Sequence, residues 1–208
     1  MGRQVVMDLK EDRLLVEAIK AGQKQGFEEL VDRYKDKVYN MTRHMTGNPQ
    51  EAQDLAQEIF LLIYKNIGSF RGESSLSTWI HRVSLNRCLD WQRKQRRRRI
   101  LSPLFSNKEE EDSGDLMDRL PNRQPTPEEQ FVRKEQIREI HKAIRSLPEK
   151  YQKVIILYHF QQMSYQEIAD ILDLPVRTVE TQLYRGKQKI REVLSQPGGK
   201  GVKTYEYV

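Results

Sequence analysis

The stretch that decides the fold reads SYQEIADILDLPVRTVETQLYRGK and spans residues 164–187. Ser164 followed three residues later by Glu167 is a capping box, which marks the start of a helix. Asp173-Leu174-Pro175 indicates a turn, because proline cannot continue a preceding helix. Apolar residues at helical spacing supply a small core: Ile168, Leu172, Leu174, Val179 and Leu183. The pattern predicts a helix-turn-helix over residues 165–187, with Ala169 where the two helices approach closely.

The second helix of this motif presents a polar and basic outer face. That face carries Arg177, Thr178, Thr181, Gln182, Tyr184, Arg185 and Lys187. An α-helix fits the major groove of DNA, where side chains near its N-terminus reach base edges. Basic residues further along can hold phosphates. The same spacing also suits an ordinary helical hairpin with a solvated basic face, and it leaves both interpretations open.

Outward from this motif, apolar residues recur at helical intervals and no alternating strand pattern appears. We expect four helices in the first half, at about residues 14–22, 27–47, 49–67 and 76–99. Asn48-Pro49 with Glu51 supplies a cap for the third of them. Two further helices should precede the motif, one at about 127–147, begun by a capping box at residues 126–129, and one at about 151–158. The last helix of the motif should end near residue 196.

Residues 100–126 separate these two groups of helices. They lack periodicity and hold three prolines and the acidic run Glu109-Glu110-Glu111-Asp112. Residues 1–99 carry 19 basic against 13 acidic side chains, residues 100–127 carry 3 against 6, and residues 128–208 carry 14 against 11. A linker of this length inside one compact domain would be unusual. The sequence therefore predicts an all-α protein with two small helical domains, 1–99 and 127–196, joined by an extended acidic linker and followed by a disordered tail at 197–208.

A second polar segment, FRGESSLSTW at residues 70–79, precedes a helix with Asn86, Trp91 and an arginine-rich end beginning at Arg93. Aromatic and small polar groups beside arginines can receive unstacked bases while the arginines follow the phosphates. The alternative is that Trp79 and Trp91 are mainly core residues and that the arginines form a solvated helix end.

Other function classes find little support in the sequence. No phosphate-binding glycine loop occurs, and the four histidines lack metal-ligand spacing with one another or with Cys88. We therefore expect no enzyme activity, no catalytic residue, no metal and no cofactor. A single cysteine and an acidic N-terminus without an apolar leader favour a cytoplasmic protein. The longest apolar run, residues 59–64, is too short to enter a bilayer directly.

Together these segments resemble the extracytoplasmic-function group of bacterial RNA polymerase sigma factors. The resemblance covers about residues 10–99 and 128–195. In the first half it rests on FEEL at 27–30, EAQDLAQEIF at 51–60 and FRGES at 70–74 followed by Thr78-Trp79. In the second half it rests on LPEKY at 147–151 and SYQEIA at 164–169, extended by the pairs at 175–176, 178–179 and 185–186. One motif would be weak, but this many in this order are specific.

The resemblance implies a sigma factor that binds core polymerase, recognises the −35 and −10 promoter elements and promotes DNA melting. Polymerase, through its clamp coiled coil, would be bound by Asp54, Leu55, Gln57, Glu58 and Phe60. The unpaired −10 element would be bound by Phe70, Arg71, Gly72, Ser74, Trp79, Asn86 and Arg93. The duplex −35 element would be bound by Arg177, Thr178, Glu180, Thr181, Gln182, Arg185 and Lys187. The implied partners also include the polymerase flap and an anti-sigma factor, often membrane-anchored.

Three residues depart from the pattern of the family. Asp173 stands at a turn position where many members have glycine, and Glu180 and Gln182 stand where members often have basic residues. These departures concern the promoter sequence rather than the fold. The main alternative is a stand-alone helix-turn-helix regulator, which would bind palindromic duplex DNA as a dimer without polymerase.

Overall fold

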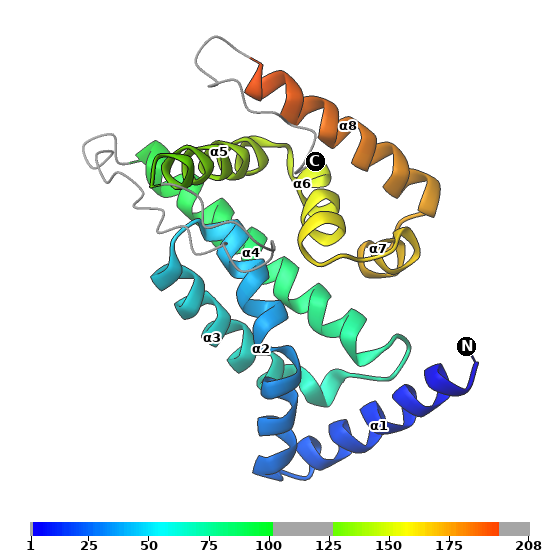
Figure 1. The fold of residues 1–208 in the computed structure, drawn as a ribbon. Helices are drawn as coiled ribbons and strands as arrows, with labels where there is room; N and C mark the ends of the chain where they lie inside the picture. The colour runs from blue at the N-terminus through cyan, green and yellow to red at the C-terminus, as the bar shows by residue number, and fades with distance from the viewer. Residues whose placement is uncertain (1, 102–126, 196–208) are drawn as a thin grey trace.

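The computed structural model describes residues 2–101 and 127–195, and every regular element in those ranges is helical (Figure 1). The first domain comprises α1 (Gly2–Lys20), α2 (Lys24–Thr46), α3 (Pro49–Asn66), the short 3-10 helix η1 (Ile67–Ser69) and α4 (Leu76–Leu101). The second comprises α5 (Pro127–Ser146), α6 (Glu149–Ile155), the π-helical turn η3 (Ile156–Phe160), α7 (Tyr165–Leu172) and α8 (Val176–Leu194). The predicted all-α class and helix-turn-helix are confirmed. The rest of the predicted linker beyond residue 101 and the predicted tail lie outside the described residues.

The corner between α2 and α3 forms from the local signals that the sequence contains. Gly47 ends α2 in the left-handed region, with φ of 76° and its N–H donating to the Arg43 carbonyl. The Asn48 side chain then accepts from the Glu51 N–H at 3.1 Å, with Pro49 at the first helical position. Proline is favourable there because its missing N–H would have no partner within the helix.

The core of the first domain lies where α2, α3 and α4 meet. Its largest fully buried side chains are Leu30, Met41, Met45, Leu55, Ile59, Ile63, Leu76, Ile80, Leu85 and Leu89. Two boundaries differ from those expected. Helix α1 begins at Gly2 rather than near Leu14, and Leu14 is 65% exposed while Leu15, Val16 and Ile19 are buried. Helix α4 runs through Leu101, so the first two residues of the predicted linker are helical.

In the second domain, α8 packs against α6 and α5. Ile155, Ile168, Val179, Leu183 and Ile190 are buried there. The helix expected over residues 151–158 is instead divided into α6 and the wider turn η3, where the Gln161 N–H donates to the Ile156 carbonyl at 3.2 Å. Four consecutive residues at this junction, 154–157, are buried, which a regular 3.6-residue period does not predict.

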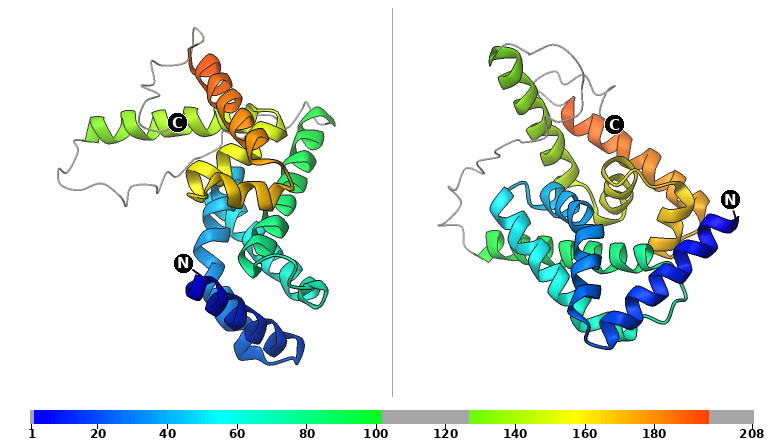
Figure 2. Two further views of the ribbon diagram at one scale, coloured as in Figure 1. Left: turned by 90° about the vertical axis from the view of Figure 1, so that its right-hand side faces the viewer. Right: turned by 60° about the horizontal axis from the view of Figure 1, so that its bottom comes forward.

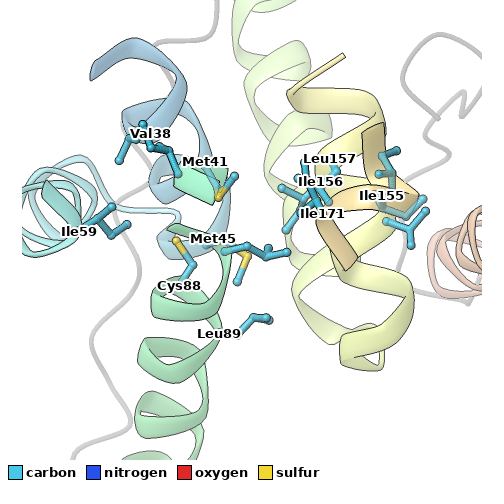
Figure 3. Close-up of a cluster of buried hydrophobic side chains, with 14 of the residues drawn as sticks. Val38, Met41, Met45, Ile59, Cys88, Leu89, Ile155, Ile156, Leu157 and Ile171 are labelled. Carbon is cyan, nitrogen blue, oxygen red and sulfur yellow. The ribbon is translucent and has the colours of Figure 1, made fainter. Parts of the chain in front are cut away.

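The two domains pack against each other along α4. Helices α2 and α3 pack on α4 within the first domain, α7 of the second domain also packs on α4, and η3 contacts α2 (Figures 1 and 2). Side chains from both sides, including Met41 and Leu89 of the first domain and Ile156 and Ile171 of the second, belong to one cluster of buried residues (Figure 3).

An aromatic contact adds to this packing between the domains. The ring of His44 in α2 stacks on Phe160 with centroids 3.6 Å apart, and His141 in α5 meets His44 edge-on at 5.0 Å. Burial holds the pKa of His44 well below its ordinary value, with the neighbouring His141 and Arg43 acting in the same direction. The imidazole is therefore uncharged in this packed arrangement.

Candidate nucleic-acid interface

The helix-turn-helix begins with the predicted capping box. The Ser164 hydroxyl accepts from the Glu167 N–H at 3.3 Å, and the Glu167 carboxylate accepts from the Ser164 N–H at 2.8 Å and from its hydroxyl at 2.7 Å. These donors hold the pKa of Glu167 below its usual value. At the far end of α7, Asp173 takes the left-handed conformation with φ of 54°. The turn therefore has the backbone that glycine would adopt without strain.

Helix α8 presents the expected polar face. Arg177, Glu180, Thr181 and Arg185 are exposed, and Thr178, Gln182 and Lys187 are half-buried. The Thr181 hydroxyl donates to the Arg177 carbonyl within the helix at 2.8 Å. The Lys187 ammonium lies 5.5 Å from the centroid of the Tyr158 ring, and burial lowers its pKa. Tyr184 is 64% exposed on the same helix, which adds an aromatic group to this face.

Gly186 on the opposite side of α8 is a structural feature that the sequence pattern did not explain. A Cβ at this position would lie 3.0 Å from Ile155 Cγ1 and 3.4 Å from Tyr151 Cβ, both on α6. The absence of a side chain lets α8 lie directly against α6, which sets the position of the neighbouring Arg185.

The loop before α4 is partly a packing element. Phe70 is only 8% exposed, and its ring meets the half-buried Trp79 edge-on at 5.7 Å. The prediction that Phe70 offers a surface to a base is therefore not met in this structure, because its ring anchors the loop to the core. Arg71 and Gly72 are exposed and Ser74 is half-buried. Trp91 is also half-buried and packs against the core, as the alternative interpretation expected.

The start of α4 is held by two caps. The Ser75 hydroxyl accepts from the Thr78 N–H at 3.1 Å, and the Asp12 carboxylate accepts from the Leu76 N–H at 3.2 Å. The second cap joins residues 64 positions apart in the chain, so no local signal could have indicated it. Both fix the direction in which α4 leaves the loop.

Helix α4 carries the predicted Asn86, which is exposed, and an arginine that the sequence analysis missed. The Arg82 guanidinium lies one turn before Asn86 and donates through Nε to the Ile171 carbonyl at 2.9 Å and through Nη2 to the Asp170 carbonyl. Further along, Arg93 pairs with Glu149 through bonds of 2.8 to 3.1 Å. This carboxylate raises the pKa of Arg93.

The predicted −10 loop and the turn of the helix-turn-helix face one cleft of about 770 Å³. Ser74, Thr78 and Arg82 line it from the first domain, and Asp173 and Val176 line it from the second. Two surfaces that were expected to contact different DNA elements are thus brought together.

The predicted polymerase surface lies on α3. Asp54, Gln57 and Glu58 are exposed and Phe60 is half-buried, whereas Leu55 is only 2% exposed. Leu55 therefore offers no surface to a partner in this structure, because it packs into the core. The Glu58 carboxylate pairs with Arg87 of α4. Two large apolar side chains beside this surface were missed, since Leu61 is 59% and Tyr64 is 52% exposed.

Residues 2–101 and 127–195 contain neither a metal-binding cluster nor a membrane-spanning helix. No group of three or more histidine, cysteine or carboxylate side chains in these ranges could hold a metal ion. None of the helices there combines the length and the apolar character that crossing a membrane requires.

Comparison with known proteins places both domains in known families. The family described as Sigma-70 region 2 matches residues 30–98, and the one described as Sigma-70, region 4 matches residues 137–190. The ECF RNA polymerase sigma factor SigW of Bacillus subtilis is 35% identical over 179 residues, covering 86% of this chain and 94% of SigW. The sigma-H factor of Pseudomonas aeruginosa is 32% identical and covers 89% of this chain and 94% of its own length.

Solved structures share the fold. A structure of CnrH in complex with the cytosolic domain of CnrY has a TM-score of 0.60 at 21% identity, covering 88% of this chain and 96% of CnrH. The sigma factor RpoE of Bartonella quintana, in complex with the anti-sigma factor NepR, has a TM-score of 0.55 at 18% identity, covering 82% of this chain and 98% of RpoE. The matched regions, the identities and the shared fold show that this chain belongs to the extracytoplasmic-function group of RNA polymerase sigma factors.

Proposed function

We propose that three separate surfaces of this sigma factor each bind one partner in initiation: core polymerase, the −10 element or the −35 element. The observation that carries this assignment is their different chemistry. The α3 surface is acidic with apolar neighbours, the loop before α4 is small and polar beside arginines, and the α8 surface is a polar helical face. Each chemistry fits one of the three partners.

The −35 element would be read by the first turns of α8 in the major groove. Arg177 is exposed at the second residue of the helix, where base edges come within reach. A bidentate arginine–guanine contact contributes about 1–3 kcal/mol of discrimination. Arg185 lies two turns further along and is suited to a phosphate, which would give affinity without sequence preference. Glu180, also exposed, can accept from a cytosine N4 amine.

The −10 element would be bound as a single strand. The loop at residues 71–75 is too short to fill a major groove as a helix does, but with its Ser74 hydroxyl it can bind the polar edge of an extruded base. Capture of such a base offsets an unstacking cost of a few kcal/mol. Asn86 and Arg93 follow along α4 and would hold the adjacent nucleotides. Phe70 acts in this scheme by supporting Trp79 rather than by contacting DNA.

Core polymerase would dock on α3. Asp54, Gln57 and Glu58 form an exposed acidic and amide surface suited to a basic helix of the clamp, and Leu61 and Tyr64 extend it with apolar area. Asp54→Ala combined with Glu58→Ala should weaken polymerase binding without unfolding the protein, because neither side chain is in the core. Titration against core polymerase tests this, with normal circular dichroism as the control. An unchanged affinity would remove both residues from the interface.

Transcription assays test promoter opening. Asn86→Ala protein should fail most on a duplex promoter and recover partly on a template whose −10 element is already an open bubble. Equal loss on both templates would contradict capture of a melted strand. A regulator acting without polymerase is not favoured, since both sigma regions are matched.

One structural neighbour is the sigma factor RpoE in complex with the anti-sigma factor NepR, and another is CnrH in complex with the cytosolic domain of CnrY. The complex of RpoE with NepR supports an anti-sigma partner for this chain as well. We propose that this sigma factor acts in the cytoplasm, where polymerase and promoters are. We assign this chain no catalytic role, because sigma factors assist initiation while polymerase carries out the chemistry.

A further inference from the structure

Three arginines along α4 donate hydrogen bonds into the second domain. Arg82 donates to the carbonyls of Ile171 and Asp170, Arg93 donates to the Glu149 carboxylate, and Arg96 donates to the Arg145 carbonyl at 2.8 Å. These contacts reach the ends of α5 and α7 and the beginning of α6. We call Arg82, Arg93 and Arg96 the arginine stripe.

The members of the arginine stripe share one face of α4. At about 100° per residue, their directions fall within an arc of about 60°, and the rise from the first to the last is about 21 Å. A row of guanidinium groups with this spacing suits the backbone of a nucleic-acid strand, since arginine binds phosphate oxygens through paired donors. The stripe also continues the proposed −10 surface, because Arg82 precedes Asn86 by one turn.

The groups that occupy the stripe have the charge of a phosphate backbone. Glu149 supplies a carboxylate. The carbonyls of Asp170, Ile171 and Arg145 belong to the last turns of their helices, where the aligned peptide dipoles leave partial negative charge. Arg93 and Glu149 keep 52% and 33% of their side-chain surface exposed. Such a pair is weak enough for a nucleic acid to displace.

This packed arrangement is incompatible with a promoter. The centres of elements named −35 and −10 lie about 25 base pairs apart, or about 85 Å along B-form DNA. In the structure the −10 loop and the first residue of α8 line one cleft of about 770 Å³. The domains must therefore separate before both elements can be bound.

We propose that the second domain is an internal competitor for the −10 surface: in the free chain, Glu149 and the helix-end carbonyls occupy the arginine stripe in place of DNA. The proposal rests on the assigned −10 surface. The free chain therefore binds single-stranded DNA poorly, and separation of the domains by polymerase uncovers the stripe.

Glu149→Arg tests this competition without altering a proposed contact with DNA or polymerase. Glu192→Arg is the matched control, because it makes the same change of charge at an exposed position of α8. Glu149→Gln keeps the shape of the side chain and guards against misfolding at the start of α6. Binding of a fluorescent oligothymidylate of about twelve nucleotides measures access to the stripe by a DNA backbone.

Domain separation is measured by energy transfer between dyes at Lys65→Cys and Val193→Cys, two exposed sites on different domains. The native Cys88 can stay, because its thiol is buried and burial raises its pKa to about 12. Transfer should fall in Glu149→Arg protein. Affinity for the oligonucleotide should rise about twofold to fivefold, the range that loss of the partly exposed ion pair between Arg93 and Glu149 allows. The second ion pair of Glu149, with Lys153, lies within α6 and does not cover the stripe. In Glu149→Gln protein, energy transfer should also fall and oligonucleotide affinity should also rise, but each by a smaller amount.

Two results would overturn the proposal. One is energy transfer and DNA affinity in Glu149→Arg protein equal to those of Glu192→Arg protein. The other is domain separation without any gain in DNA affinity, which would mean that the second domain does not block the stripe. Run-off transcription with core polymerase separates this failure from a wrong assignment of function. Glu149→Arg protein should direct transcription whether or not the second domain blocks the stripe. A protein that is not a sigma factor would direct none.

Discussion

Gly186→Val should displace α8, the helix proposed to bind the −35 element, by crowding the side that packs against α6. Gly186 is buried where α8 packs on α6, and a Cβ there would lie 3.0 Å from Ile155 Cγ1 and 3.3 Å from its Cδ1. Valine adds two further methyl groups beyond that Cβ. Either Ile155 leaves its position in the core or α8 moves outward from α6, and the second response carries Arg185 with it.

The magnitude follows from two opposing effects. Overpacking of a filled core costs about 1–3 kcal/mol. Replacing glycine by valine within a helix returns a few tenths of a kcal/mol in helix propensity. The net expectation is a loss of about 1–2.5 kcal/mol. At about 4–8 °C per kcal/mol for a domain of this size, Tm should fall by at least about 4 °C.

Thermal unfolding followed by circular dichroism measures the loss, and binding to −35 duplex DNA within the polymerase complex measures its consequence. Gly186→Ala is the control, because its gain of about 1 kcal/mol in helix propensity opposes a smaller clash. We expect the alanine variant to stay within about 1 kcal/mol of the natural protein. A valine variant with unchanged Tm and unchanged DNA affinity would refute the close contact between α8 and α6.

Three further substitutions test local features of the second domain. Gln152→Met should stabilise the protein by about 1–3 kcal/mol, because both polar atoms of the fully buried Gln152 side chain lack hydrogen bonds; an unchanged denaturation midpoint would contradict this. Ser164→Ala should cost about 1 kcal/mol at neutral pH by removing the cap of α7. The lowered pKa of Glu167 means that its contribution is present above its ordinary pKa and is lost as pH falls, so the difference between variant and natural protein should shrink in acid; a constant difference would exclude the carboxylate. Asp173→Gly should raise stability by about 0.5 kcal/mol, because glycine takes a φ of 54° without strain but gains entropy when unfolded; a lower Tm would show that the Asp173 side chain stabilises the turn.

The sequence by itself determined the features that depend on near neighbours. The caps at Asn48 and Ser164, the end of α2 at Gly47 and the turn at Asp173 each involve residues within four positions of one another. Their hydrogen bonds form within one turn of helix, so residue types at fixed spacing are sufficient to predict them. The ordered motifs likewise placed the chain in its family, because they record which residues both promoter-binding domains need.

Only the tertiary structure decided which side chains of the predicted surfaces are available. Leu55 and Phe70 belong to matching motifs but are buried. The sequence pattern assigned no role to Arg82 or Gly186. In the structure Arg82 donates a hydrogen bond to α7, and Gly186 packs closely against α6. The physical reason is that burial and pairing depend on elements far away in the chain, such as α7, whose Ile171 accepts from Arg82 across 89 residues. Local spacing specifies a helical face, but the partner that covers this face is selected by packing of the whole chain.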